Sequence, residues 1–229
     1  MNESYYMNVT VEGKDIDEVW TTWYDRLVSM NLGDSSRDGD IRGEIINATS
    51  IIKDPTRNIL KSEIRNLPMR YAIGEMLWYM SGSVKLQEIQ KFTKGWDRMS
   101  DNGITVNSNY GYCIKEKYGF DQWEFVKKEL KNNPNSRRAI IHIKEPSNKH
   151  SKDINCTVCL QFFIRDNKLH LTTYMRSNDL WMGFPYDVFQ FTNMQVLMSM
   201  ELERPVGIYT HIAGSLHLYE RDIKVEAKE

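Results

Sequence analysis

The residues best suited to chemistry lie between Cys156 and Asp187. Cys156 is a soft nucleophile if it is held as the thiolate. Arg176 is a fixed cation that can lower the pKa of a nearby thiol or bind a phosphate, and Asp179 and Asp187 are carboxylates. We expect two adjacent strands and the start of a helix to bring these side chains together. Such a set suits nucleophilic attack on an anionic substrate.

Glu75 is a second candidate, because it is a lone carboxylate inside the apolar segment from Leu67 to Met80. A buried carboxylate is costly unless it is hydrogen-bonded or functional. Burial favours its protonated form, which suits proton transfer. We therefore interpret Glu75 as a catalytic residue.

Other polar residues allow two interpretations on local grounds. Cys156 is equally a small core residue, and Arg176 equally a surface arginine at a strand end. Arg137 and Arg138 bind a phosphate or form a solvated pair, and His217 and Tyr219 share one strand face. Cys156 and Cys159 form a Cys-x-x-Cys, but the chain has no second such pair, so no metal site is expected and Cys159 is taken as structural.

Length and composition restrict the class of protein. The chain has 229 residues, enough to bury a sizeable core, and we expect a single catalytic domain over 1–229. Three cysteines and a polar N-terminus predict a cytoplasmic protein with free thiols. A net charge of −1 with mixed signs makes nucleic-acid binding unlikely, and no run of apolar residues suits a membrane.

The hydrophobic spacing predicts an α+β fold, with a large mixed β-sheet packed against long buried helices. Polar residues predict a loop over Asp34–Asp40, and Asp166-Asn167 predicts a tight hairpin turn. The predicted helices are Asp15–Met30, Leu67–Met80, Asp121–Lys131 and Tyr186–Met200; the predicted strands are Glu44–Ile52, Ala139–Ile143, Val158–Ile164, Leu169–Met175 and Gly207–Tyr219.

Taken together, the motifs resemble those of the thymidylate synthase superfamily from about Arg37 to Tyr219. Six matches occur in the family's order, and only together are they specific. They are Glu75-Met76-Leu77-Trp78, Tyr110-Gly111, Ser136-Arg137-Arg138, Asn155-Cys156-Thr157 with Gln161-Phe162, Arg176-Ser177-Asn178-Asp179 with Gly183-Phe184-Pro185-Tyr186-Asp187, and His217-Leu218-Tyr219.

The resemblance implies the family's fold, with a sheet face used for dimerisation, and its chemistry. Cys156 would attack carbon 6 of a pyrimidine, Glu75 would organise a proton-transferring water, and 5,10-methylenetetrahydrofolate would donate one carbon. The implied substrate contacts are Arg37, Arg137, Arg138, Gln161, Arg176, Ser177, Asn178, Asp179, Asp187, His217 and Tyr219, with Arg137 and Arg138 supplied by the partner of a homodimer. The implied cofactor contacts are Trp96, Tyr110, Asp179 and Gly183.

Two departures from the family pattern resemble its deoxycytidylate or cytidylate 5-hydroxymethylase branch. Thymidylate synthases have asparagine where this chain has Asp187, and histidine where it has Thr157. A protonated carboxylic acid donates to the bare ring nitrogen 3 of cytosine and accepts from its amino group, whereas an asparagine amide pairs with uracil. Burial would favour that protonated form, and a proton from Asp187 would stabilise charge on nitrogen 3.

The sequence therefore predicts folate-dependent hydroxymethylation of dCMP or CMP. Only ten residues follow Tyr219, so the lid of thymidylate synthases is expected to be missing, which favours capture by water over hydride transfer. Two alternatives are thymidylate synthesis from dUMP and a catalytically inactive nucleotide- or RNA-binding module. The choice between ribose and deoxyribose, and between modified phage DNA and antimetabolite synthesis, stays open.

Overall fold

A computed structural model describes residues 6–36, 38–146 and 150–223. The chain forms two compact units. The first unit takes in the described parts of Met1–Leu67, Tyr174–Asn193 and Gly207–Glu229, and the second takes in those of Pro68–Thr173 and Met194–Val206. Three elements, β7 (Lys168–Met175), α6 (Phe184–Glu201) and β9 (Val206–Tyr219), contribute residues to both units.

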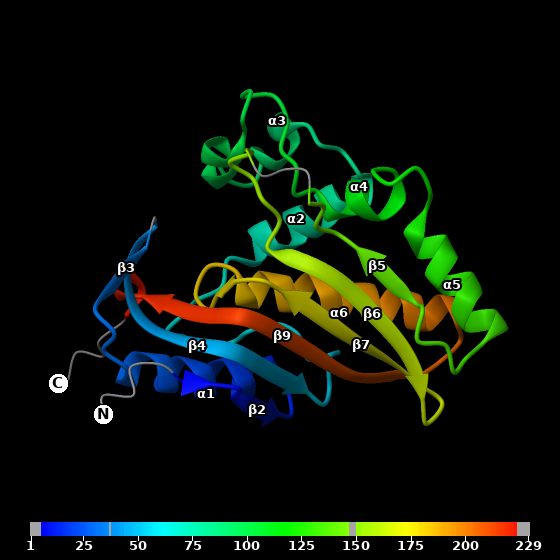
Figure 1. The fold of residues 1–229 in the computed structure, drawn as a ribbon, viewed down its shortest axis with the longest axis horizontal. Helices are drawn as coiled ribbons and strands as arrows, with labels where there is room; N and C mark the ends of the chain where they lie inside the picture. The colour runs from blue at the N-terminus through cyan, green and yellow to red at the C-terminus, as the bar shows by residue number, and fades with distance from the viewer. Residues whose placement is uncertain (1–5, 37, 147–149, 224–229) are drawn as a thin grey trace. The chain divides into compact units, whose positions relative to one another are not determined.

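The described strands form a nine-stranded sheet with parallel and antiparallel pairs, which confirms the expected α+β class (Figure 1). In the first unit, β1 (Tyr6–Met7) and β2 (Thr10–Gly13) pair in parallel with β4 (Gly39–Ile52). β9 runs antiparallel to β4 along most of its length, and β8 (Asn178–Asp179) pairs in parallel with β9.

Helix α1 (Ile16–Ser29) covers β4 in the first unit. Asp15 caps its N-terminus by accepting a hydrogen bond from the backbone N–H of Glu18, which satisfies a donor that a helix start leaves unpaired. Gly43 of β4 lets the helix come close, because a Cβ there would lie 2.5 Å from the carbonyl oxygen of Leu27. The buried side of α1 consists of Ile16, Val19, Trp20, Trp23, Tyr24 and Leu27.

The second unit contains most of the other helices and the strand pair β5–β6. Its elements are α2 (Met69–Ser81), α3 (Leu86–Ile89), the 3₁₀ turn η1 (Gly95–Met99), α4 (Tyr110–Lys115), α5 (Gln122–Asn132), β5 (Ile140–His142), β6 (Thr157–Arg165) and the first part of β7. The predicted turn between β6 and β7 is confirmed, since Asp166 and Asn167 have φ values of 49° and 60°. Near the C-terminus of the first unit, η2 (Glu220–Asp222) follows β9.

Two expectations about elements were wrong. Asp34–Asp40 is not a loop throughout, because β3 (Asp34–Ser36) pairs with the start of β4 at Gly39–Ile41. Helix α2 is not buried all round, because Ile73, Leu77 and Met80 are 50%, 55% and 58% exposed. Its buried side carries Ala72, Gly74, Glu75, Trp78 and Tyr79, and it ends as expected at Gly82, which has a left-handed φ of 65°.

No helix in the described parts of the chain is long and apolar enough to cross a membrane.

Candidate active site

In the first unit, β8 and the start of α6 bring four predicted site residues together: Asn178, Asp179, Gly183 and Asp187. Parallel pairing with β9 sets Asp179 opposite His217. Oδ1 of Asp179 accepts hydrogen bonds from the backbone N–H groups of Trp181 (2.8 Å) and Met182 (3.0 Å). The carboxylate thereby holds the turn that leads from β8 into α6.

Asp187 lies in the first turn of α6 and is half-buried. Its Oδ2 accepts a hydrogen bond of 2.8 Å from Nδ2 of Asn178, which is itself buried. Gly183 makes room for this contact, because a Cβ there would lie 2.9 Å from Nδ2 of Asn178 and 3.3 Å from Oδ2 of Asp187. Asn178, predicted to bind substrate, thus contacts the predicted base-reading carboxylate.

His217 of β9 is buried, and burial lowers the pKa of its imidazole, although the nearby Asp179 and Glu44 carboxylates oppose that shift. The hydroxyl of Ser215 donates to Glu44, so its oxygen is left to accept from Nδ1 of His217 at 3.3 Å. A neutral histidine with its proton on Nδ1 has an acceptor at Nε2. That acceptor suits a sugar hydroxyl.

Tyr219 stands next to His217, with the two rings edge to face at 5.2 Å. Its hydroxyl lies 3.4 Å from Oγ of Ser36, and the guanidinium of Arg221 lies 4.3 Å from the centre of its ring. Arg37, the residue after Ser36 and a predicted phosphate ligand, lies outside the described residues.

Arg176 and Ser177 follow β7 in the first unit. The side chain of Arg176 is exposed and Ser177 is half-buried. The backbone oxygen of Arg176 lies so near β9 that a Cβ on Gly214 would approach it to 2.8 Å. The backbone beside the predicted phosphate ligand is therefore fixed against β9.

In the second unit, Glu75 is buried on α2 and is 5% exposed. The hydroxyl of Tyr71 donates to Oε1 of Glu75 at 2.6 Å, and Nε1 of Trp96 donates to that hydroxyl oxygen at 3.1 Å. Two predicted site residues, Glu75 and Trp96, are thus joined through a tyrosine. This network holds the carboxylate in place and supplies it with one fixed donor.

Aromatic rings connect this network to the strand that follows Cys156. Trp96 meets Trp78 edge to face at 5.2 Å, and Tyr79 stacks on Tyr110 at 4.9 Å. The hydroxyl of Tyr110 accepts a hydrogen bond of 3.0 Å from Oγ1 of Thr157. The indole N–H of Trp78 is buried and has no hydrogen-bond partner in the structure.

Cys156 is half-buried and lies directly before β6. Burial raises the pKa of Cys113 to about 11 and also raises that of Cys159. These two thiols therefore stay protonated at neutral pH, which makes them poor nucleophiles. Thr157 stands where the family pattern has histidine, and its buried hydroxyl donates to Tyr110.

Arg137 and Arg138 are both exposed. Neither forms an ion pair with another residue of the described chain. Nε2 of Gln161, a predicted substrate ligand on β6, donates to the backbone oxygen of Arg137 at 3.1 Å. The backbone at the arginine pair is thereby tied to β6, and both guanidinium groups face solvent.

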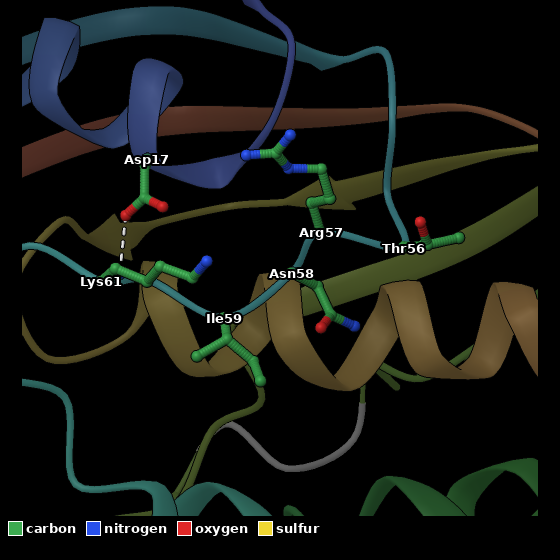
Figure 2. Close-up of a pocket in the computed structure, with 6 residues that line it drawn as sticks. All are labelled: Asp17, Thr56, Arg57, Asn58, Ile59 and Lys61. Carbon is green, nitrogen blue, oxygen red and sulfur yellow. Dashed lines mark hydrogen bonds between the residues drawn. The ribbon is translucent and has the colours of Figure 1, made fainter.

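A surface hollow of about 220 Å³ in the first unit contains none of the predicted site residues (Figure 2). Asp17, Thr56, Arg57, Asn58, Ile59 and Lys61 line it. Asp17 accepts from the backbone N–H of Lys61, and Arg57 pairs with Asp15, so the carboxylate of Asp17 and the guanidinium of Arg57 are engaged in contacts within the chain.

Sequence reasoning missed two residues that connect to Asp187, Tyr209 and His211. Both lie on the buried face of β9. Oη of Tyr209 contacts Nδ1 of His211 at 2.8 Å, and Nε2 of His211 contacts Oδ1 of Asn178 at 3.0 Å. A histidine at an inward position of an otherwise apolar strand face is the signal that was available.

A sequence profile of the family described as thymidylate synthase matches residues 23–228. The chain belongs to the thymidylate synthase family. It is 30% identical over 192 residues to deoxyuridylate hydroxymethyltransferase of Bacillus phage SP01, covering 77% of this chain and 50% of that protein. It is 29% identical over 170 residues to thymidylate synthase 1 of Bacillus spizizenii, covering 69% and 60% respectively. The chain thus spans only half to three fifths of the length of these relatives.

Solved structures support the thymidylate synthase fold. Thymidylate synthase from T4 phage superimposes with a TM-score of 0.73 at 20% identity, over 92% of this chain and 82% of that one. Thymidylate synthase A from Bacillus subtilis gives a TM-score of 0.73 at 23% identity, over 90% and 80%. These likenesses establish the expected fold.

Proposed function

We propose that the chain is a folate-dependent 5-hydroxymethylase of a cytidine monophosphate nucleotide. The observation that carries the proposal is the carboxyl group of Asp187 at the start of α6, with Asn178 donating to its Oδ2. A neutral carboxyl offers one donor and one acceptor side by side, the pattern that complements ring nitrogen 3 and the amino group of cytosine. Uracil offers the opposite pattern at both positions.

Cys156 is the proposed nucleophile. Its sulfur forms a bond to carbon 6 of the base, and the electron pair of the 5,6 double bond moves toward carbon 5 and nitrogen 3. Asp187 donates its hydrogen bond, and in the limit its proton, to nitrogen 3, where negative charge builds up. The same thiolate leaves at the end, so Cys156 is regenerated.

Glu75 is the proposed organiser of the water that moves protons. Tyr71 already donates to its Oε1, and Trp96 fixes that tyrosine. The second oxygen of the carboxyl is thus held in one orientation relative to the helix. The product of water capture carries a hydroxymethyl group, and the Bacillus phage SP01 relative is named for such a transfer.

The nucleotide's other groups have proposed ligands as well. His217, with its acceptor at Nε2, and Tyr219 suit the sugar hydroxyl, and Arg37, Arg176 and Ser177 suit the phosphate. Arg137 and Arg138, which are exposed and form no ion pair with another described residue, suit the phosphate bound by a second subunit. The accessible face of β4 and β9, which carries Ile51, Ile208 and Ile212, supports pairing through the sheet in a homodimer.

The residues present fit a folate. Half-buried Trp96 offers aromatic surface to a flat ring and packs against Trp78, whose buried N–H has no acceptor among the described residues. When bound, methylenetetrahydrofolate supplies the one-carbon unit that the product carries at carbon 5. Trp96, Tyr110, Asp179 and Gly183 are its proposed contacts.

A second candidate is the same chemistry on a uracil nucleotide, with a methyl or hydroxymethyl product. The names of the relatives favour it, because they are thymidylate synthases and a deoxyuridylate hydroxymethyltransferase. Asp187 opposes it. A binding module that has lost catalysis is a third candidate, opposed by the joint presence of Cys156 and Glu75.

One assay separates the three. The protein is incubated with methylenetetrahydrofolate and each of dCMP, CMP, dUMP and UMP in ¹⁸O-labelled water, and the products are identified by mass. A labelled hydroxymethyl group on a cytidylate is the expected product. Turnover of uridylates alone would refute the cytosine assignment, and no product would favour the binding module.

A further inference from the structure

A row of four polar side chains crosses the interior of the first unit from β9 to α6. It runs from Tyr209 through His211 and Asn178 to Asp187, with consecutive contacts of 2.8, 3.0 and 2.8 Å. Tyr209, His211 and Asn178 are 0%, 1% and 3% exposed. Polar groups this deeply buried are retained only when they are hydrogen-bonded, so the row acts as one unit.

The histidine in the row is neutral. Burial lowers its pKa to about 3, so His211 carries no charge at physiological pH. The ring of Phe184 meets it edge to face at 5.1 Å, which fixes the imidazole plane. A neutral imidazole has one donor and one acceptor nitrogen, so the bonds at its two ends are of opposite kind.

The direction of the row follows from its carboxyl end. Oδ2 of Asp187 accepts, because Asn178 turns its Nδ2 amide donor toward it. The other end of that amide, Oδ1, must then accept from Nε2–H of His211. Nδ1 of His211 is left as the acceptor, and the hydroxyl of Tyr209 donates to it. Every donor from the tyrosine onward therefore points toward Asp187.

This polarity decides where a neutral Asp187 carries its proton. An oxygen that accepts from Asn178 is disfavoured as the protonated one, because the carbonyl oxygen of a neutral carboxyl group is a better acceptor than its hydroxyl oxygen. The proton belongs on Oδ1, and Oδ2 is the acceptor oxygen of the carboxyl group. That arrangement complements cytosine and repels both hydrogen-bonding groups of uracil.

We propose that Tyr209, His211 and Asn178 are positioning residues that select cytosine over uracil by fixing Oδ2 of Asp187 as an acceptor. The inference rests on the proposed function and adds to it the three residues that act through the carboxyl group. Gly183 supports the same arrangement, because a side chain at that position would collide with Nδ2 of Asn178.

The test measures Kd values for dCMP, CMP, dUMP and UMP by calorimetry, with the full chain and its variants. Asn178→Ala removes the donor to Asp187, and we expect the preference for cytosine over uracil to fall by about tenfold or more. Tyr209→Phe deletes one hydroxyl at the far end and should lower the preference in the same direction by a smaller factor. It also tests the proposal if Asn178→Ala does not fold.

A matched control is Asn58→Ala. Asn58 is also buried in the first unit, but its Nδ2 donates to the hydroxyl of Thr192 at 2.9 Å. Losing that bond should leave the base preference unchanged. The double variant Asn178→Ala with Asp187→Asn completes a cycle: the effect of Asn178→Ala should largely vanish once Asp187 is replaced, because the row acts through that residue.

The outcomes separate the two proposals. A wild-type preference for cytosine that falls in Asn178→Ala and Tyr209→Phe, non-additively with Asp187→Asn, supports the row. A wild-type preference for cytosine that survives both variants, with all four nucleotides weakened equally, overturns the row and leaves the proposed function standing. A wild-type protein that prefers uracil nucleotides overturns both.

Discussion

Replacing Gly111 by alanine tests how closely α2 and α4 pack in the second unit. A Cβ at this position would lie 1.6 Å from the carbonyl oxygen of Tyr79 and 2.6 Å from its carbonyl carbon. Both are backbone atoms, so no side chain can rotate away. The helices must separate by about 2 Å to restore a contact distance of about 3.5 Å.

The cost follows from what lies beside the contact. The amide of Asn109 donates to the carbonyl oxygens of Trp78 and Ser83, each at 2.8 Å, and these bonds contribute about 1 kcal/mol apiece. The stack of Tyr79 on Tyr110 adds about 1 kcal/mol. Alanine's better helix propensity returns about 1 kcal/mol, so we expect a net loss of about 2 kcal/mol.

Thermal unfolding followed by circular dichroism measures the effect, and for a chain of this length the Tm should fall by about 4–8 °C. The KM for methylenetetrahydrofolate should rise as well, because Tyr110 is a proposed folate contact and Trp78 packs against another, Trp96. Gly95→Ala is the control: the nearest atom to its Cβ would be Oγ1 of Thr93 at 3.4 Å, an ordinary contact. A Tm and a KM that match those of the wild type in Gly111→Ala would refute the close packing.

Three further predictions concern the site. Cys156→Ser should lower turnover by about a thousandfold or more while dCMP still binds, whereas Cys159→Ser stays active; rapid turnover by Cys156→Ser would place the nucleophile elsewhere. Asp187→Asn should shift the kcat/KM ratio from cytosine toward uracil nucleotides by about a hundredfold, since two hydrogen bonds change partners, and an unchanged ratio removes Asp187 from base selection. Stability should fall as the pH drops below about 6.5, by about 1.4 kcal/mol per pH unit from His211 alone, because the unfolded chain takes up a proton that the buried ring refuses until its pKa of about 3. Urea unfolding at several pH values measures this dependence. In His211→Asn the free energy of unfolding should change less with pH, by that amount, and a pH dependence equal to the wild type's contradicts the buried neutral ring.

Local pattern was enough to predict the long elements. Alternating side chains give β7 its buried face at Leu169, Leu171, Thr173 and Met175, and Asp166-Asn167 specifies the turn because both residues tolerate positive φ. Glu75 could be singled out because a carboxylate among apolar residues is unusual, and its burial on α2 is as expected.

Features that depend on partners far away in the sequence could not be predicted from the sequence. β3 consists of exposed polar residues, Asp34–Ser36, and is a strand only because it pairs with β4. The two residues of β8 are a strand only because β9 lies beside them. The sequence did not predict the exposed side of α2, because a helix with few polar residues does not show which face is buried.

In the site, too, local motifs were predictable and long-range contacts were not. The motifs pointed to Asp187, Asn178 and His217, but the row of polar side chains behind Asp187 depends on His211, whose partner on β8 is far away in the sequence. No spacing rule connects a histidine on one strand to an asparagine on another. The folded chain nevertheless brings Nε2 of His211 within 3.0 Å of Oδ1 of Asn178.

The division of the first unit among three separate stretches of chain has a consequence during synthesis. β4 is made early, yet its antiparallel partner β9 emerges from the ribosome only after the whole of residues 68–173. Until then one edge of a fourteen-residue strand stays unpaired, and such an edge invites association with other nascent chains. Slow elongation or a truncated product should therefore lead to aggregation through β4, whereas residues 68–173 have already met most of their own partners.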